Sequence, residues 1–575
     1  MKKNFYSFAL ASLLMLSANP IFAKDYYLAT SGNDANNGET AETALATLNA
    51  AVAKLQAGDV LHVSGMIPVS ETAAFAHLKA QPVTIKGEDK DTDGFDGQST
   101  CRIINPNDSH VIFQNLTFQN GKLNEEDGKM GGGAIAANAS NIEVDNCYFM
   151  DNATLQTMGR GGAIGMVGGS LKVSNTLFSG NISRCGGAIY MNGSTKLELY
   201  SNQFFANQAL VGENQIPNQN DATDGGALWI RSVGDITVQY CQFDSNVAHR
   251  AGGAISFDSA LKNLKVEGCS FTNNWNGGQN ESFTFVTGNT DGINAAGRFG
   301  RGDGGAISLY VGGVKDGAIL NFFSNTFAGN NSPRNGGAMN VGGNKTGIEL
   351  NFVNNTIVNN TTVGGVGNSA GIYAENKTFP IRIVNTIIEG NYCEANTQFA
   401  DVVFGTTETT FTSSVVGYVR KLEDNQAKYT IDSKSKLNTT PNRGNEVSID
   451  LGSIDDIQDG CFPLPADNAD VTTMGSLAEA KLLGLTVDQK GQEWTKPYIG
   501  AVQLVKGDEI PENPIYSSIS KVNNDAYTGA AQTYIYNVTG QLVSKATSVN
   551  GLPQGIYVVK TVAGKTVNTR KVYVK

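Results

Sequence analysis

Apolar and polar positions alternate in short runs along the middle of the chain. Residues 171–175 read LKVSN and residues 236–240 read ITVQY, with an apolar residue at every second position. A β-strand places successive side chains on opposite faces, so this period of two predicts strands with one buried face. Gly and Asn residues separate the runs and indicate turns. The middle of the chain is therefore predicted to be all-β.

These runs belong to a repeat with two fixed marks. A copy opens on two glycines, an alanine and an aliphatic residue, and it closes on Phe or Ile, two variable residues and Asn. Where no insertion intervenes, the closing Asn returns every 26 to 31 residues. The closing segments are Phe149–Asn152, Phe178–Asn181, Phe204–Asn207, Phe243–Asn246, Phe271–Asn274, Phe327–Asn330, Ile357–Asn360 and Ile388–Asn391, and FQN at Phe118 is read as a degenerate first copy.

A unit of this length cannot bury its own apolar face, but stacked copies share one core. We therefore predict a right-handed parallel β-helix solenoid. Its glycine pairs would allow a tight turn where a side chain would clash. The closing Asn would stack at a bend, with its amide bonding along the helix axis and its own backbone in the left-handed region. The Phe residues would form one inward ladder, and a second would contain Ile135, Ile164, Ile189, Leu228, Ile255, Ile307 and Met339.

The pairing of GGA[ILM] with FxxN across residues 115–392 resembles the repeat of chlamydial polymorphic outer-membrane proteins and related surface β-helices. Two flanking segments, Tyr26–Gly65 and Thr486–Gln503, resemble the first and closing segments of secreted right-handed β-helix proteins. After Pro514, three segments have a strand-like pattern: YIYNVTGQLV, GLPQGIYVVK and RKVYVK. They resemble the C-terminal sorting domain of the type IX secretion system of Bacteroidetes. That resemblance implies a small β-sandwich and the type IX machinery as a partner.

The N-terminus predicts export. Lys2 and Lys3 precede an apolar run from Phe8 to Leu16, and small residues follow up to Ala23, which is typical of a cleaved signal peptide. No later stretch has the roughly 18 apolar residues of a membrane-spanning helix. We expect a protein that is secreted or attached to the outer-membrane surface. The expected divisions are a signal peptide (1–23), the start and cap of the β-helix (24–110), the GGAI/FxxN repeats (111–400), C-terminal coils with a closing segment (401–510) and a sorting β-sandwich (511–575).

Charge and cysteine content argue against a nucleic-acid partner and against a zinc site. The chain has 42 basic and 53 acidic residues with no basic stripe, which argues against a nucleic-acid partner. Its seven cysteines lack the CxxC spacing of a zinc site. Cys147, Cys241 and Cys269 share one repeat position, which favours buried thiols. A disulfide between Cys241 and Cys269 on adjacent coils stays open as an alternative.

Catalytic chemistry leaves little trace in this sequence. Lyases built on β-helices gather carboxylates that hold calcium, whereas Glu143, Lys172, Glu198, Thr237 and Lys265 alternate in sign along the outward positions of one strand. We expect cross-strand charge pairs there and no metal site or cofactor. Catalytic residues remain unknown.

An enzyme is the alternative interpretation: a polysaccharide lyase or glycoside hydrolase acting on acidic polysaccharide, with calcium in the case of a lyase. Asp224 and Asp303 each precede a glycine pair and could join a group of catalytic carboxylates. Solvated turn charges are the simpler reading of both.

Two long insertions interrupt the repeat, one between Asn207 and Gly225 and one between Asn274 and Gly304. Insertions in a solenoid leave at one corner and often build its binding face. If the aliphatic ladder points inward, the next residue and the one two further on point outward at the feet of these insertions. The candidate binding residues are Tyr190, Trp229, Arg231, Asp258 and Tyr310, together with Trp275, Arg298 and Arg301 of the second insertion.

Aromatic rings offer an apolar surface to sugars, and Arg and Asp form charge-assisted hydrogen bonds to hydroxyls and carboxylates. The sequence therefore favours a monomeric adhesin-like or glycan-binding protein that takes a polysaccharide or a host-surface glycan. In the alternative, the insertions fold back and bury the rings of Tyr190 and Trp229, and Arg231 and Asp258 form only a salt bridge.

Overall fold

The structure is a computed structural model. It describes residues 23–123, 131–154, 159–210, 223–259, 261–276, 303–362, 369–374, 378–393, 398–399, 401–404, 408–420, 429–438, 449, 451, 457, 460–508, 532–537, 542–544, 555–563 and 566–574. Residues 1–22 of the expected signal peptide, and Arg298 and Arg301 of the second insertion, lie outside these ranges.

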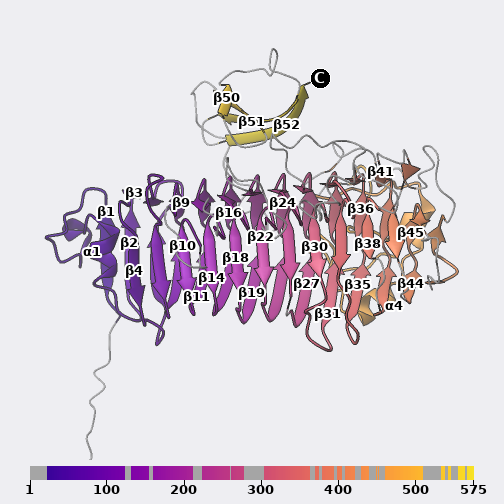
Figure 1. The fold of residues 1–575 in the computed structure, drawn as a ribbon, viewed down its shortest axis with the longest axis horizontal. Coiled ribbons are helices and arrows are strands. Elements are labelled where there is room, and N and C mark those ends of the chain that lie inside the picture. The colour runs from indigo at the N-terminus through magenta and orange to yellow at the C-terminus, as the bar shows by residue number, and fades with distance from the viewer. Residues whose placement is uncertain are drawn as a thin grey trace, which may run out of the picture.

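The described residues form four long sheets that run side by side along one axis (Figure 1). We name them sheets A, B, C and D, with 14, 13, 12 and 9 strands. Neighbouring strands are parallel throughout, except that β41 and β42 at the end of sheet D are antiparallel.

Strands of five residues predominate in sheet A, and those of sheet B are shorter. Sheet A contains β1 (Asp25–Ala29), β2 (Val60–Ser64), β5 (Val83–Gly87), β8 (His110–Gln114), β11 (Asn141–Asp145), β15 (Ser170–Ser174), β19 (Lys196–Tyr200), β23 (Asp235–Gln239), β27 (Asn263–Glu267), β31 (Ile319–Phe323), β35 (Glu349–Val353), β39 (Ile381–Val384), β44 (Thr409–Thr412) and β47 (Tyr429–Ile431). Sheet B contains β3 (Met66–Pro68), β6 (Gly94–Asp96), β9 (Thr117–Gln119), β12 (Tyr148–Met150), β16 (Leu177–Ser179), β20 (Gln203–Phe205), β24 (Gln242–Asp244), β28 (Ser270–Thr272), β32 (Thr326–Ala328), β36 (Thr356–Val358), β40 (Ile387–Glu389), β45 (Val415–Val416) and β48 (Lys436–Leu437).

Sheet C begins each coil and sheet D ends it. Sheet C contains β4 (Ala73–Ala76), β7 (Ile104–Asn107), β10 (Ile135–Asn138), β14 (Ile164–Val167), β18 (Ile189–Asn192), β22 (Leu228–Arg231), β26 (Ile255–Asp258), β30 (Ile307–Tyr310), β34 (Met339–Gly342), β38 (Ile372–Ala374), β43 (Val402–Phe404) and β46 (Val419–Arg420). Sheet D contains β13 (Ala153–Thr154), β17 (Ile182–Ser183), β21 (Gln208–Ala209), β25 (Val247–Ala248), β29 (Trp275–Asn276), β33 (Asn331–Ser332), β37 (Thr361–Thr362), β41 (Tyr392–Cys393) and β42 (Gln398–Phe399).

One coil passes through sheets C, A, B and D in that order, so one copy of the repeat is one coil. Equivalent repeat positions lie in register on neighbouring coils: Ile189 pairs with Leu228, and Phe178 pairs with Phe204. The predicted parallel β-helix is therefore confirmed.

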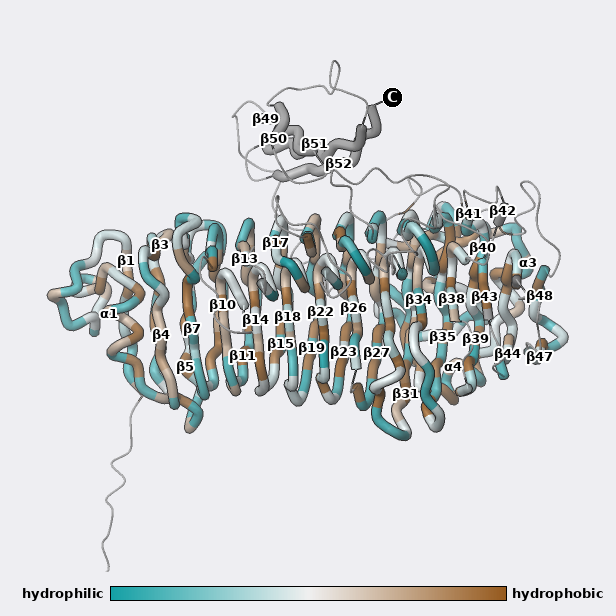
Figure 2. Tube along the Cα trace, viewed as in Figure 1, coloured by the Kyte–Doolittle hydropathy of each residue, from teal (hydrophilic) through white to brown (hydrophobic). Residues whose placement is uncertain are grey.

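Both predicted inward ladders exist. Every member of the aliphatic ladder after GGA is buried in one continuous core. The Phe rings stack with centroids 4.8 Å apart from Phe118 to Phe149 and again from Phe149 to Phe178, so Phe118 belongs to the Phe ladder, although Gly121 stands where a full copy has its closing Asn. Phe95 extends this stack by one coil, with its centroid 5.4 Å from that of Phe118. Figure 2 shows the resulting alternation of hydrophobic and hydrophilic residues along the coils.

The closing Asn residues form a hydrogen-bonded ladder along the helix axis. The Nδ2 atom of Asn152 donates to Oδ1 of Asn181 at 3.0 Å, and the same bond recurs from coil to coil down to Asn391, which donates to Oδ1 of Asp401 at 2.7 Å. The ladder is confirmed, but its predicted left-handed backbone is wrong. The residue before each ladder Asn has the positive φ, for example Asp151 at 55° and Asn273 at 55°. The chain bends at the outward residue because the ladder side chain must enter the core.

A second ladder runs through the turns between sheets A and B and contains the three cysteines of the shared repeat position. The backbone N of Cys241 donates to Sγ of Cys269 at 3.4 Å, and the backbone N of Cys269 donates to Oδ1 of Asn325 at 2.9 Å. The thiols are free and buried, so the disulfide between Cys241 and Cys269 is not formed in this structure. Burial raises the pKa of the Cys147 thiol to about 12, which makes it unreactive.

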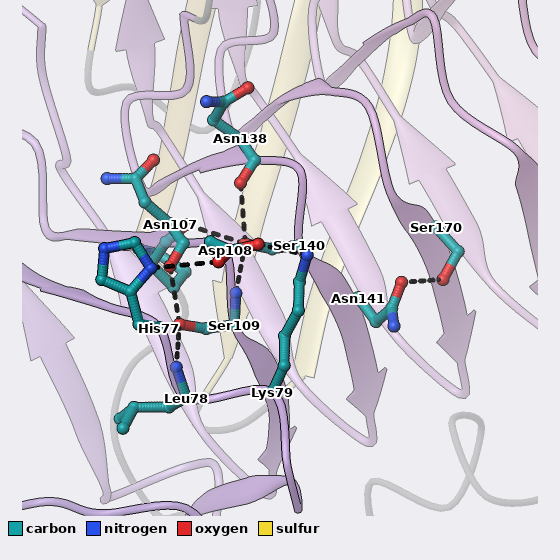
Figure 3. A network of polar contacts seen from close by, with 11 residues as sticks. His77, Leu78, Lys79, Asn107, Asp108, Ser109, Asn138, Ser140, Asn141 and Ser170 are labelled. Atoms are coloured by element: carbon teal, nitrogen blue, oxygen red, sulfur yellow. Dashed lines mark hydrogen bonds and ion pairs between the residues drawn. The ribbon is translucent and has the colours of Figure 1, made fainter.

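Serine hydroxyls connect the turns between sheets C and A in the first coils (Figure 3). The backbone N of Ser109 donates to Oγ of Ser140 at 3.1 Å, and Oγ of Ser109 accepts from the backbone N of Leu78 at 3.2 Å. On the solvent side, Asp108 pairs with His77 and Lys79. Successive coils are thus joined by side-chain hydrogen bonds at the bends as well as by the sheets.

The glycine pair has the predicted steric role. Gly225 has a φ of 68°, and a Cβ there would lie 1.9 Å from the carbonyl oxygen of Leu228. A Cβ on Gly226 would lie 2.0 Å from the carbonyl oxygen of Gly253 on the next coil. No side chain fits at either position without moving backbone.

Segments before and after the repeats pack on the solenoid. The short helices η1 (Ala41–Thr43) and α1 (Leu48–Val52) lie at the N-terminal end, and Leu48 and Val52 join the core. Residues 460–508 contain α3 (Ala469–Thr473) and α4 (Leu477–Leu482) and pack on outward faces of sheets A and B. Trp494 of the expected closing segment is buried there against Phe323 and Val353. Among the described residues, no helix is long and apolar enough to cross a membrane.

The C-terminal part contains an antiparallel sheet in the order β50 (Leu542–Ser544), β49 (Gln532–Asn537), β51 (Gly555–Ala563) and β52 (Thr566–Val574). The three strand-like segments identified after Pro514 overlap these strands. Within the described residues they form a single sheet, without the second layer of the expected sandwich.

Candidate functional site

The outward face of sheet C, where both insertions leave the helix, contains most of the candidate residues. The strand register places Tyr190 beside Trp229, Arg231 beside Asp258, and Asp258 beside Tyr310. The two predicted outward rows are therefore present. We call the outward side of β14, β18, β22, β26, β30 and β34 the sheet C face.

The inner row, Tyr190 and Trp229, is buried. Their side chains are 0% and 3% exposed, and they form a small cluster with Cys185. The ring centroids lie 5.1 Å apart, and the guanidinium group of Arg160 lies 5.2 Å from the Tyr190 ring and 5.9 Å from the Trp229 ring. The rings are therefore buried and not open, while the insertions that were expected to cover them in the second alternative lie largely outside the described residues. Tyr190 and Trp229 therefore do not form an open stacking platform, and the guanidinium group of Arg160 lies near both rings.

The outer row is accessible. Arg231 and Asp258 form an ion pair of 3.5 Å with side chains 45% and 29% exposed, and Tyr310 is 41% exposed. The guanidinium group of Arg231 also lies 5.7 Å from the Trp229 ring, so it bridges the two rows. These three side chains offer a cation, a carboxylate and an aromatic ring to solvent on consecutive coils.

Trp275 is not part of this face. It lies on β29 of sheet D, where it pairs with Val247 and Asn331. The register therefore does not bring it together with the outer row. Arg298 and Arg301 fall outside the described residues.

Two ion pairs hold the residues that follow the insertions. Arg250 donates from Nε to Asp224 at 2.7 Å, and Arg334 donates from Nε to Asp303 at 2.9 Å. Both aspartates are buried, so their interpretation as solvated turn charges is wrong. Each carboxylate is paired with an Arg of the next coil. The two aspartates therefore fix the chain at the end of each insertion and are not available as catalytic acids.

Burial and the Asp–Arg pairs set the pKa values of the titratable groups between sheets D and C. Burial acts to lower the pKa of Arg250, but Asp224 outweighs it and raises that pKa. Burial lowers the pKa of the neighbouring His249 to about 4 and raises that of the Cys185 thiol to about 12, so both are neutral near pH 7. Sequence reasoning missed Arg160 and Arg250 as members of the site. Their signal is a basic residue one or two positions before a glycine pair.

Sheet A has no comparable arrangement among the described residues. Glu143 and Lys172 pair across strands at 3.5 Å as predicted, but Glu198 pairs with Lys196 of its own strand at 2.8 Å, and Lys265 with Glu267 of its own strand at 2.7 Å. A shallow hollow of about 350 Å³ lies over β23, β27 and β31 and is lined by Asp235, Lys265 and Ile319 among others. In the part of the chain that is described, no group of three or more His, Cys, Asp or Glu side chains is placed to hold a metal ion.

Residues 103–291 match the family model described as "Right handed beta helix region". Together with the parallel sheets, this match establishes the all-β right-handed parallel β-helix.

The metabotropic glutamate receptor-like protein P of Dictyostelium discoideum is 30% identical over 253 residues, which cover 35% of this chain. The chain spans 17% of the length of that protein.

Two solved structures also match. One is the pectate lyase Pel9A, with a TM-score of 0.18, 11% identity, and 85% of this chain and 91% of that chain covered. The other is a complex of XylC with xylose, with a TM-score of 0.21, 9% identity, and 70% and 71% covered. Superposition is poor in both cases, and neither bears on the chemistry of the sheet C face.

Proposed function

We propose that this protein binds a polysaccharide or a surface glycan along the sheet C face, as an exported adhesin-like β-helix protein without catalytic activity. The observation that carries the proposal is the outer row on three consecutive coils, in which Arg231 and Tyr310 are exposed and Asp258 is partly exposed. Coils repeat at about 4.8 Å, so a row of this kind presents a periodic surface to an extended, repetitive ligand. The exposed ring of Tyr310 can pack against the face of a sugar. Arg231 and Asp258 can form hydrogen bonds with the hydroxyl groups of that sugar.

The position of the row also supports binding. Both insertions join the helix at the corner that borders sheet C, and the Asp224–Arg250 and Asp303–Arg334 pairs fix the chain where each insertion ends. A rigid face flanked by long connections is the usual arrangement of a binding surface on a solenoid.

Tyr310→Ala is expected to weaken glycan binding by about tenfold while the melting temperature stays within about 1 °C of the wild type, because an exposed ring contributes little to packing. Affinity electrophoresis against a panel of neutral and acidic polysaccharides measures the loss. The matched control is Tyr200→Ala, since Tyr200 is 40% exposed but lies on sheet A. An equal loss of affinity in both variants, or no loss of affinity in Tyr310→Ala, would show that sheet C is not the binding face. Release of reducing ends or unsaturated uronate by the wild type would show catalysis in place of binding.

Export rests on the resemblances of the N- and C-terminal segments, and it extends the proposal. Deleting residues 515–575 in the native host is expected to leave the protein in the periplasm, because the segment that resembles a sorting signal lies there. Immunoblots of periplasmic and surface fractions measure the change. A substitution in the solenoid such as Lys172→Gln serves as the control and should not alter localisation. Normal surface display of the truncated protein would contradict the sorting role.

A further inference from the structure

Two buried hydrogen-bond donors on the sheet C face have no acceptor among the described residues, although Arg160 interacts with the oxygen of one of them. They are Oη of Tyr190 and Nε1 of Trp229. An unmet buried polar group costs about 1–3 kcal/mol, so two adjacent unmet donors favour a bound acceptor at this place. Of the outward residues on the next coils, Ser256 and Ser308 are small and Tyr310 is exposed.

The two donors lie beneath positive charge. Arg160 is within 6 Å of both ring centroids, at 5.2 Å and 5.9 Å, and Arg231 lies 5.7 Å from the Trp229 ring. Arg231 pairs with Asp258. Arg160 has no carboxylate partner among the ion pairs of the described residues, although the neighbouring coils pair their Arg residues with Asp224 and Asp303.

The chemistry of these groups selects the ligand. An indole N–H only donates, a guanidinium only donates, and a protonated phenol has one hydrogen to donate. Burial raises the pKa of Tyr190, against the charges of Arg160 and Arg231, so the hydroxyl keeps its proton at neutral pH. A site made of donors and one uncompensated cation is complementary to an anion with several acceptor oxygens. A neutral hydroxyl would leave the charge of Arg160 unmatched.

We propose that Arg160, Tyr190 and Trp229 form a binding site for an anionic group on a sugar, either a carboxylate or a sulfate ester. The inference rests on the proposed glycan binding and deepens it, because it makes the ligand an acidic glycan. The outer row of Arg231, Asp258 and Tyr310 contacts the chain of sugars, and the anionic group reaches inward beside Arg160. The Arg160 side chain is long and half-buried, so the proposal requires its guanidinium group to move from the rings when the ligand binds.

The test uses the mature protein with three probes: polygalacturonate, dextran sulfate and neutral dextran. We expect polygalacturonate or dextran sulfate to bind at least about tenfold more tightly than dextran, and the better of the two identifies carboxylate or sulfate as the natural group. Arg160→Gln is expected to remove this preference, with a loss of about tenfold or more for the anionic probe and no change for dextran. Lys172→Gln on sheet A, which removes the same charge from an exposed site, is the control and should keep the preference.

Tyr190→Phe separates binding from packing. It removes only the hydroxyl, whose hydrogen has no acceptor among the described residues, and keeps the ring, so we expect a melting temperature close to that of the wild type together with weaker binding of the anionic probe. A lower melting temperature with unchanged affinity would show that the hydroxyl is satisfied by water, and it would overturn the site. Binding of all three probes with equal affinity would also overturn it but would keep the proposed glycan binding. If no probe and no polysaccharide of the panel binds to the wild type, both proposals fail.

Discussion

Replacing Ile255 by Asp is expected to prevent cooperative folding of the β-helix. Ile255 is fully buried in the aliphatic ladder, directly between Leu228 and Ile307 of the neighbouring coils. The change removes an apolar side chain, which alone costs about 2–5 kcal/mol. It also places a carboxylate in the core with no cation in reach, which costs several kcal/mol more. The sum is comparable to the whole stability of an ordinary domain.

Far-UV circular dichroism and urea unfolding of the purified variant measure this effect. The matched control is Asn192→Asp, which introduces the same charge on an outward, partly exposed position of β18 in the same sheet. That control should keep the midpoint of the wild type. A soluble Ile255→Asp protein with an unchanged midpoint would contradict the inward ladder and the register built on it.

Asp401 is expected to make the protein less stable as the pH rises. Asp401 ends the Asn ladder: its Oδ1 atom accepts from the backbone N and from Nδ2 of Asn391, at 2.9 Å and 2.7 Å. Complete burial raises the pKa of Asp401 to about 8, and the hydrogen bonds from Asn391 oppose this rise only in part. In the unfolded chain the pKa is about 3.9. Between these values the folded state binds the additional proton, so its stability is complete below about pH 4 and is lost progressively up to about pH 8.

Asp401→Asn should remove this loss, because an Asn continues the ladder with the same Oδ1 acceptor and carries no charge. We expect the free energy of unfolding at pH 9 to rise, by on the order of 5 kcal/mol at most, with little change at pH 4. Urea unfolding at both pH values measures it.

Asp432→Asn is a control at a carboxyl group whose pKa is shifted by folding in the opposite direction. Burial acts to raise the pKa of Asp432, but hydrogen bonds from Ser435 and Ser413 outweigh it and lower that pKa. This variant should therefore lose stability near pH 7 and little at the lowest pH. A pH dependence that is the same in Asp401→Asn and in the wild type would show that the buried carboxyl is not the source.

The sequence predicted the interior of the solenoid well because each inward position repeats. The columns of Ile189 and Phe178 follow directly from a period of two inside a longer repeat, and the strand register preserves both. The bend beside Asn152 was misplaced by one residue, since the repeat marks the residue that hydrogen-bonds and not the one that turns. That distinction depends on backbone dihedral angles, which the pattern does not encode.

The outside of the solenoid was harder to predict. Trp229 is buried with Arg160 beside it, and Arg160 belongs to a coil two repeats earlier, so the repeat pattern does not reveal this contact. The pairing of Asp224 with Arg250 is diagonal between neighbouring repeat positions, so it appears only once the turns are aligned in space.

A usable signal was present where residues 460–508 cover the helix. There the outward residues Phe323, Val353 and Val384 are apolar, and the alternation of the earlier coils is lost.

The most direct test of glycan binding on sheet C is hydrogen–deuterium exchange of the wild-type protein with and without a saturating polysaccharide. Glycan binding on sheet C is expected to give new protection in peptides that contain β22, β26 and β30, and unchanged exchange in peptides that contain β19 and β23 of sheet A. Protection confined to sheet A, or saturable binding that leaves β22, β26 and β30 unprotected, would contradict it.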